Sequence, residues 1–201
     1  MRGLLLLGLL VGFIAFQAYW FQRVTPTEAR LAEVAGSIAG SEVEVYCPSI
    51  YRRLIEVTGF KGTAQPGVDG KPGRAHLTHE VCATFEDLPE RGFPTDVSCL
   101  VGNPPTCDDW TMDAGVAVHV LSHESWHLRG VVDEGTAECY AWQTDGQIAR
   151  LFGAPVGVAD QFAYFFAARG GQAALPQYRP PAGCNPGGRL DLHPETVGWP
   201  S

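Results

Sequence analysis

The chain has 201 residues, and 14 Lys and Arg residues against 22 Asp and Glu residues give it a formal net charge of −8. This length suits one domain and is too short for two of ordinary size. The acidic balance offers no basic stripe to neutralise phosphates and excludes a nucleic-acid binder, while a hydrophobic content of 45% excludes a disordered chain.

The first 23 residues are almost entirely apolar. No charged side chain lies between Arg2 and Arg23, and about 20 apolar residues suffice for a helix to cross the hydrocarbon core of a membrane. A cleaved signal peptide is the competing interpretation, but the segment offers no convincing small-x-small cleavage site. We therefore expect residues 1–23 to be a signal anchor of a single-pass membrane protein. Residues 24–201 would form its extracytoplasmic domain, or a secreted domain if the segment is cleaved.

The remaining chain predicts a mixture of helices and short strands. Thr25, Pro26 and Glu28 have the capping-box pattern of a helix that should run to about residue 39. Polar and apolar residues alternate over 42–46, as in a half-buried strand. The other expected elements are a short helix over 48–57, a loop over 58–74, a strand over 75–81, a short helix through 88, a stapled loop over 89–111, helices over 114–129, 133–152 and 158–169, and an extended tail from 170.

Six cysteines follow the apolar segment, and none of them forms a C-x-x-C pair. This number and spacing predict up to three disulfides, among 15 complete pairings that the sequence leaves open. Cys139 is interpreted as a disulfide anchor and not as a metal ligand. The six are Cys47, Cys82, Cys99, Cys107, Cys139 and Cys184.

The most informative motif is H-E-x-x-H, formed by His123, Glu124 and His127 within the helix expected over 114–129. Residues four apart on a helix differ by about 40° in azimuth and about 6 Å along the axis, so both imidazoles could converge on one ion. Zinc is the ion that this pattern predicts. The metal would lower the pKa of a water, and Glu124 would take its proton and later deliver it to the leaving amine.

Residues 114–145 resemble the zincin metallopeptidases, specifically their gluzincin branch. The run Asp133-Glu134-Gly135-Thr136-Ala137-Glu138 is similar to the E-G-x-A-E signature that follows H-E-x-x-H in several such families. The resemblance implies a zincin-like fold, peptide-bond hydrolysis, Glu134 as third ligand and Glu138 as the group that orients an imidazole.

The spacing departs from most gluzincins, because only six residues separate His127 from Glu134. Gly130 and Asp133 also fit H-E-x-x-H-x-x-G-x-x-D, which resembles a small metzincin-like variant with Asp as third ligand.

Geometry alone favours a different third ligand. In a hairpin that turns near residues 130–131, helical side chains lean toward their own N-terminus, so the histidines lean away from the turn. Glu138 then reaches the level of the ion more easily than Glu134. We therefore favour Glu138, followed by Glu134, with Asp133 third because it is the expected N-cap of the second helix.

Other polar residues receive weaker assignments. His119 lies about 12 Å from His127 along the helix, too far to share the ion, and is interpreted as a satisfied core residue or a group behind the ligands. His76 and His79 could lie along a substrate cleft, although exposed strand histidines are the favoured interpretation. The candidates for stabilising the oxyanion of a tetrahedral intermediate are Tyr140, Tyr178 and His193.

Together these patterns predict an α+β fold: a small zincin-like domain with an active-site helix hairpin, a short antiparallel sheet and disulfide-stapled loops. The predicted function is zinc-dependent hydrolysis of peptide or protein substrates. The alternative is a non-catalytic cell-surface interaction or envelope-assembly module with a structural metal, and in a third interpretation the motif binds no metal. Substrate preference and oligomeric state stay open.

Overall fold

The computed structural model describes residue 12 and residues 24–48, 61–101, 105–173 and 175–195. This part of the chain is α+β, with five α-helices and a small three-stranded sheet. In chain order the elements are α2 (Pro26–Ala39), β1 (Val43–Tyr46), β2 (Gly62–Gln65), β3 (Gly73–Leu77), α4 (His79–Arg91), the 3₁₀ turn η1 (Ser98–Val101), α5 (Asp109–Leu128), α6 (Glu134–Leu151), α7 (Val156–Ala173) and the 3₁₀ turn η2 (Pro176–Tyr178).

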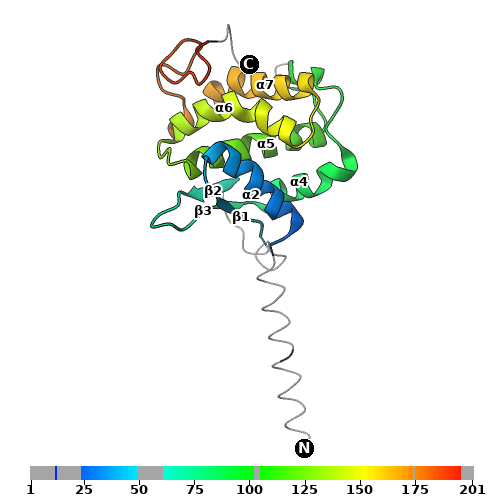
Figure 1. Ribbon diagram of the computed structural model, residues 1–201. Coiled ribbons are helices and arrows are strands. Elements are labelled where there is room, and N and C mark those ends of the chain that lie inside the picture. The colour runs from blue at the N-terminus through cyan, green and yellow to red at the C-terminus, as the bar shows by residue number, and fades with distance from the viewer. Residues whose placement is uncertain (1–11, 13–23, 49–60, 102–104, 174, 196–201) are drawn as a thin grey trace, which may run out of the picture.

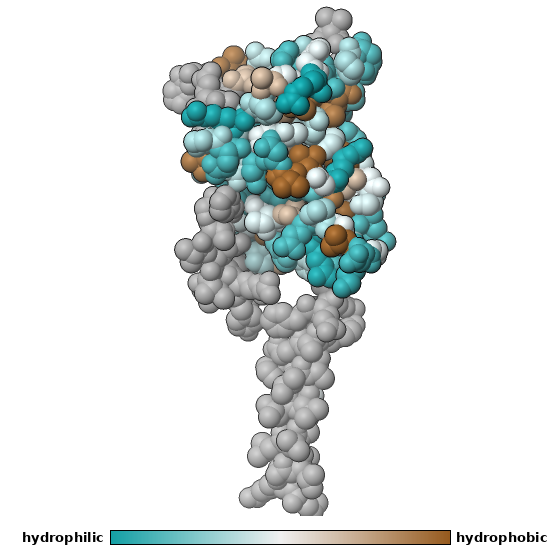
Figure 2. Space-filling model, turned by 90° about the vertical axis from the view of Figure 1, so that its left-hand side faces the viewer, coloured by the Kyte–Doolittle hydropathy of each residue, from teal (hydrophilic) through white to brown (hydrophobic). Residues whose placement is uncertain are grey.

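The helices form layers, with α7, α6 and α5 stacked in turn and the sheet and α2 on the far side of α5 (Figure 1). Helix α5 is therefore the centre of the domain, and Val118 and Leu121 on it are completely buried. A Cβ at Gly115 would lie 3.0 Å from the ring of Phe162, so this glycine lets α7 pack closely. On the face shown in Figure 2, hydrophobic residues form separate areas between hydrophilic ones.

The capping box predicted for α2 is confirmed. Thr25 Oγ1 accepts from the Glu28 backbone N–H at 3.1 Å, and Glu28 Oε2 accepts from the Thr25 N–H at 2.8 Å. The second oxygen of Glu28 accepts from the backbone N–H of Cys47 at 2.8 Å. One side chain thus starts the helix and fastens it to the chain that follows β1.

The sheet differs from the expectation in three respects. Its order is β1-β3-β2, and β1 pairs with β3 in parallel, so the sheet is mixed and not antiparallel. β2 lies inside the segment expected to be a loop, because pairing with β3 stabilises a sequence of weak strand propensity. The expected strand over 75–81 ends early, since Thr78 is the N-cap of α4 and His79 is the first residue of that helix.

The other helix predictions are confirmed with shifted ends. α5 begins at Asp109, because Asp108 caps it by accepting from the Thr111 N–H at 2.7 Å. The tail expected to be extended instead contains η2 and turns with positive φ at Gly183 and Gly187. The helix expected over 48–57 lies almost entirely outside the described residues.

Three disulfides are formed, as the cysteine number predicts. Cys99–Cys107 closes the loop before α5, Cys47–Cys82 joins the end of β1 to α4, and Cys139–Cys184 joins α6 to the C-terminal segment. Within the described ranges no cysteine is free.

The predicted single-pass membrane localisation is corrected. Of the helices that the structure describes, none combines the length and the apolar character that a membrane crossing requires. Even α5, with 20 residues, carries Asp109, Asp113 and Glu124. Apart from Gly12, residues 1–23, from which the anchor was predicted, lie outside the described part of the chain.

Candidate metal centre

The hairpin between α5 and α6 brings the histidines of the H-E-x-x-H motif close to the glutamates of α6. α5 ends at Leu128, and Gly130 turns the chain with a φ of 101°. Asp133 caps α6 by accepting from the Thr136 N–H at 2.8 Å and the Thr136 hydroxyl at 2.6 Å. Its carboxylate therefore serves as the N-cap and is not part of the ligand group described next.

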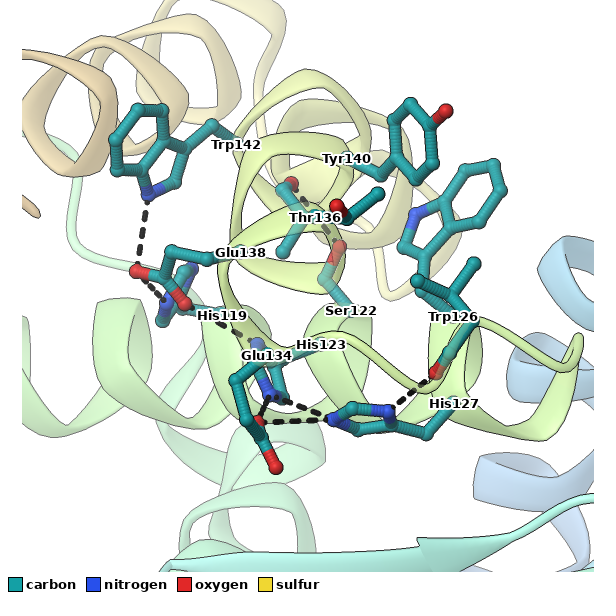
Figure 3. A network of polar contacts seen from close by, with 12 residues as sticks. His119, Ser122, His123, Trp126, His127, Glu134, Thr136, Glu138, Tyr140 and Trp142 are labelled. Atoms are coloured by element: carbon teal, nitrogen blue, oxygen red, sulfur yellow. Dashed lines mark hydrogen bonds and ion pairs between the residues drawn. The ribbon is translucent and has the colours of Figure 1, made fainter. Parts of the chain in front are cut away.

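Three side chains converge at the mouth of this hairpin (Figure 3). Glu134 Oε2 lies 2.9 Å from His123 Nε2 and 3.1 Å from His127 Nε2. The two Nε2 atoms lie 3.0 Å apart. This group, called here the pocket cluster, could hold a metal ion.

The other ring nitrogens determine where the protons are. His127 Nδ1 lies 2.6 Å from the carbonyl oxygen of Val131, and His123 Nδ1 lies 3.1 Å from Glu138 Oε2. A carbonyl only accepts, and an ionised carboxylate does the same, so each Nδ1 carries the proton. Both Nε2 atoms lie beside the same Glu134 oxygen, where a proton or a cation can join nitrogen to carboxylate. Burial opposes the charge on His123, but Glu138 and Glu124 outweigh it and raise the pKa of His123.

The structure brings Glu134, and not Glu138, to the two Nε2 atoms. Glu138 is level with His123, as the sequence geometry required, but it contacts the far nitrogen of that ring. Glu134 lies one turn nearer the start of α6, and its side chain, 39% exposed, extends across the open end of the hairpin. The sequence geometry compared heights along the helices and did not include the direction in which each ring faces.

Behind the pocket cluster lies a second group, called here the buried cluster, consisting of His119, Glu138 and Asp145. His119 Nε2 lies 3.2 Å from Glu138 Oε1, and Nδ1 lies 3.0 Å from Oδ2 of Asp145, which is completely buried. Burial opposes the charge on His119, but Asp145 and Glu138 outweigh it and raise the pKa of His119 to about 10. Burial likewise opposes the charge on Glu138, and His119 with His123 lowers the pKa of this carboxyl below its usual range.

Glu124 lies beside the pocket cluster and differs from Glu138 in its hydrogen bonding and its pKa. Its side chain is 5% exposed, and its Oε2 finds no hydrogen-bond partner among the described residues. Burial raises the pKa of Glu124 to about 7; His123 opposes this shift and Glu134 adds to it. The buried carboxyl is thus available to exchange a proton near neutral pH.

Gly62 on β2 makes room for Glu124. A Cβ at this position would lie 2.7 Å from Glu124 Oε1 and 2.8 Å from its Cγ. The edge strand therefore approaches the carboxyl closely. The sequence analysis missed Gly62, because the surrounding residues showed no strand pattern.

A cavity of about 560 Å³ opens in front of the pocket cluster. β2 lies on one side of it and η2 on another, and its apolar lining includes Val120, Val131, Val132 and Leu175. Tyr178 also lines the cavity, with its ring centroid 5.7 Å from that of His123. Burial and the carboxylates Glu134, Glu124 and Glu138 raise the pKa of Tyr178 to about 12, so its hydroxyl keeps its proton.

The C-terminal segment that carries Tyr178 is fastened to α6. Gln143 donates from Nε2 to the Leu190 carbonyl at 2.9 Å and accepts from the Leu192 N–H at 2.7 Å. The Cys139–Cys184 disulfide anchors the same segment to α6. Cys139 lies one residue after Glu138 and is a disulfide anchor, as expected.

The other oxyanion candidates do not line this cavity. Tyr140 packs on Trp126, with ring centroids 4.6 Å apart, on the side of α6 away from Glu134 (Figure 3). His193 Nδ1 lies 3.4 Å from Glu195 Oε1. His76 is exposed and stacks on Tyr46 at 5.1 Å, in keeping with the favoured interpretation.

Asp145 and Trp142 are the polar partners that sequence reasoning missed. Trp142 donates from Nε1 to Glu138 Oε1 at 3.1 Å. The i, i+4 spacing from Glu138 to Trp142 was the available signal, and the i, i+7 spacing to Asp145 places all three on one face of α6.

No protein-family model, curated protein or solved structure matches this chain.

Proposed function

We propose that this protein is a zinc-dependent metallopeptidase, with the ion held by His123, His127 and Glu134. Two imidazole nitrogens and one carboxylate oxygen form the ligand set of many catalytic zinc sites, which leave a position open. Ligands at about 2.0–2.1 Å from a tetrahedral ion lie about 3.3 Å apart, close to the 2.9–3.1 Å separations in the pocket cluster.

One observation carries the proposal: an unpartnered carboxylate oxygen of Glu124 lies buried beside three side chains whose ligand atoms are close enough to share one ion. A bound zinc ion would supply Lewis acidity, which lowers the pKa of a water and polarises a substrate carbonyl. Glu124 would accept the proton from the attacking water and return it to the nitrogen of the leaving amine. A pKa near 7 suits both directions of this transfer.

The remaining groups of the cavity suit a peptide substrate. Tyr178 keeps its phenolic proton and would donate a hydrogen bond to the developing oxyanion. β2 is an edge strand of the described sheet and lines the cavity, so its outer backbone groups suit an extended peptide. Val131, Val132 and Leu175 would accommodate an apolar substrate side chain.

Glu124→Gln tests the proposal. The variant keeps the shape and the metal ligands but loses the proton acceptor, so we expect hydrolysis of unstructured peptides to fall by about 10²–10⁴-fold. Zinc content by elemental analysis should stay at the wild-type level. Glu33→Gln, an exposed carboxylate on α2, is the matched control and should leave the rate unchanged.

Two outcomes would contradict the proposal. Unchanged hydrolysis in Glu124→Gln would remove Glu124 from the mechanism. A wild-type protein that binds zinc, unfolds on chelation and cleaves no peptide would instead support the alternative of a non-catalytic module with a structural metal.

A further inference from the structure

The buried cluster has a proton arrangement that its geometry fixes. His119 faces a carboxylate oxygen with each ring nitrogen, Asp145 from one side and Glu138 from the other. Ionised carboxylates only accept hydrogen bonds, and although burial raises the pKa of Asp145, the contact with His119 opposes this shift. With both carboxyls ionised, His119 donates from both nitrogens. A neutral imidazole has one N–H, and the ring between these two groups is therefore an imidazolium.

Glu138 is fully engaged as a result. Its Oε1 accepts from His119 Nε2 and from Trp142 Nε1, at 3.2 and 3.1 Å. Its Oε2 is directed at His123 Nδ1, at 3.1 Å. Two donors on one oxygen thus hold the carboxylate in the orientation in which the other oxygen accepts from His123 (Figure 3).

We propose that His119, clamped by Asp145, is a positioning residue for the metal site: it fixes Glu138, which keeps the proton of His123 on Nδ1 and leaves Nε2 for the ion. The proposal deepens the proposed metallopeptidase function and depends on its metal site. His119 does not contact the ion. It acts through Glu138, at a distance of two hydrogen bonds from His123 Nε2.

The charges of the two clusters support this role. Glu124, Glu134 and Glu138 all line the cavity, and His119 is the cation paired with Glu138. The ring of His119 is also stacked on Phe166, with centroids 4.3 Å apart and planes at 9°, which fixes the orientation of both nitrogens. A histidine that served packing alone would need only the contact with Phe166.

His119→Phe tests the proposal by keeping an aromatic ring and removing both donors. We expect zinc affinity, measured by competition with a chromophoric chelator, to fall by about 10–100-fold, the range for groups that orient metal ligands. In the metal-free protein, at a pH high enough for His123 to be neutral, ¹⁵N NMR of labelled histidine should show the remaining proton on Nδ1 in the wild type and a mixture of tautomers in the variant. Asp145→Asn should move both measurements in the same direction and carries the test if His119→Phe does not fold.

Phe166→Leu is the matched control. It loosens the packing of His119 without removing a hydrogen bond, so it should lower the melting temperature and leave zinc affinity and the His123 tautomer unchanged. The proposal would be overturned if zinc affinity and the His123 tautomer both kept their wild-type values in His119→Phe or Asp145→Asn. If the wild type itself binds no zinc, the metal site falls, while the tautomer measurement still decides the role of His119.

Discussion

The pocket cluster and the buried cluster use the same chemistry on the same two helices, one helical turn apart. In the buried cluster, each nitrogen of His119 faces its own carboxylate, although Asp145 Oδ1 has no hydrogen-bond partner among the described residues. In the pocket cluster, the Nε2 atoms of two rings share a single carboxylate oxygen of Glu134. At the opposite ring nitrogens of the pocket cluster, the Val131 carbonyl accepts from His127 Nδ1 and Glu138 accepts from His123 Nδ1. Residue type alone therefore does not distinguish the two clusters; what differs is whether one carboxylate oxygen is shared by two rings.

Substituting Glu134 and Glu138 separately should give the largest difference between the two clusters. We expect Glu134→Ala to abolish stoichiometric zinc binding after dialysis, measured by elemental analysis, because it removes one of three ligand atoms. Glu138→Gln should retain the ion with an affinity lowered by about 10–100-fold, since Glu138 only orients His123. Equal loss of zinc in both variants would contradict the different roles given to the two glutamates. Loss of zinc in Glu138→Gln alone would show that these roles are reversed.

The two buried carboxyls should also differ in their effect on stability. Folding raises the pKa of Glu124 from 4.5 to about 7, so the ionised carboxyl destabilises the metal-free protein increasingly as pH rises through this interval. Glu124→Gln should therefore raise the free energy of unfolding at pH 8 by at most roughly 3 kcal/mol. Urea unfolding of the metal-free protein at pH 8 and pH 4 measures this, with little difference expected at the lower pH.

Glu138→Gln provides the contrast in the same experiment. The lowered pKa of Glu138 means that its ionised form contributes stability above pH 4.5, which is lost as pH falls through the folded-state value. The Gln variant should thus be less stable than the wild type at pH 8, by about 2 kcal/mol, because donors to a charged group lose their partner. Stabilisation by both substitutions would contradict the account of the buried cluster.

A smaller effect is expected from filling the space that Gly62 leaves beside Glu124. Gly62→Ala places a methyl group 2.7 Å from Glu124 Oε1 and must displace the carboxyl or the strand. We expect kcat to fall by about 10–100-fold with zinc content unchanged, since small misplacement of a catalytic group has effects of this size. Gly157→Ala is the control, because a Cβ there meets no atom within 4 Å. A normal rate in Gly62→Ala would show that Glu124 tolerates displacement.

Local signals predicted the framework of the site well. The capping box of Thr25 and Glu28 and the H-E-x-x-H helix depend on residues three or four apart, and both helices form where the sequence indicated. β2 could not be predicted, because its stability comes from pairing with β3, whose paired residues lie 9 to 15 positions further along the chain.

The different positions of Glu134 and Glu138 depend on contacts that the sequence does not display. Glu138 lies level with His123 as predicted, but His119 and Trp142 hold it on the far side of that ring. Asp145 escaped notice for the same reason, since its role depends on the packing of α6 against α5. Tyr178 was one of three equal candidates until the Cys139–Cys184 segment brought it to the cavity.

The most direct test of the metal site is anomalous X-ray diffraction at the zinc edge from crystals of the zinc-loaded protein. The account predicts one strong peak about 2.0–2.2 Å from His123 Nε2, His127 Nε2 and an oxygen of Glu134, with Glu138 at Nδ1 of His123. A peak coordinated by Glu138 or His119, or no peak between the two Nε2 atoms, would contradict it.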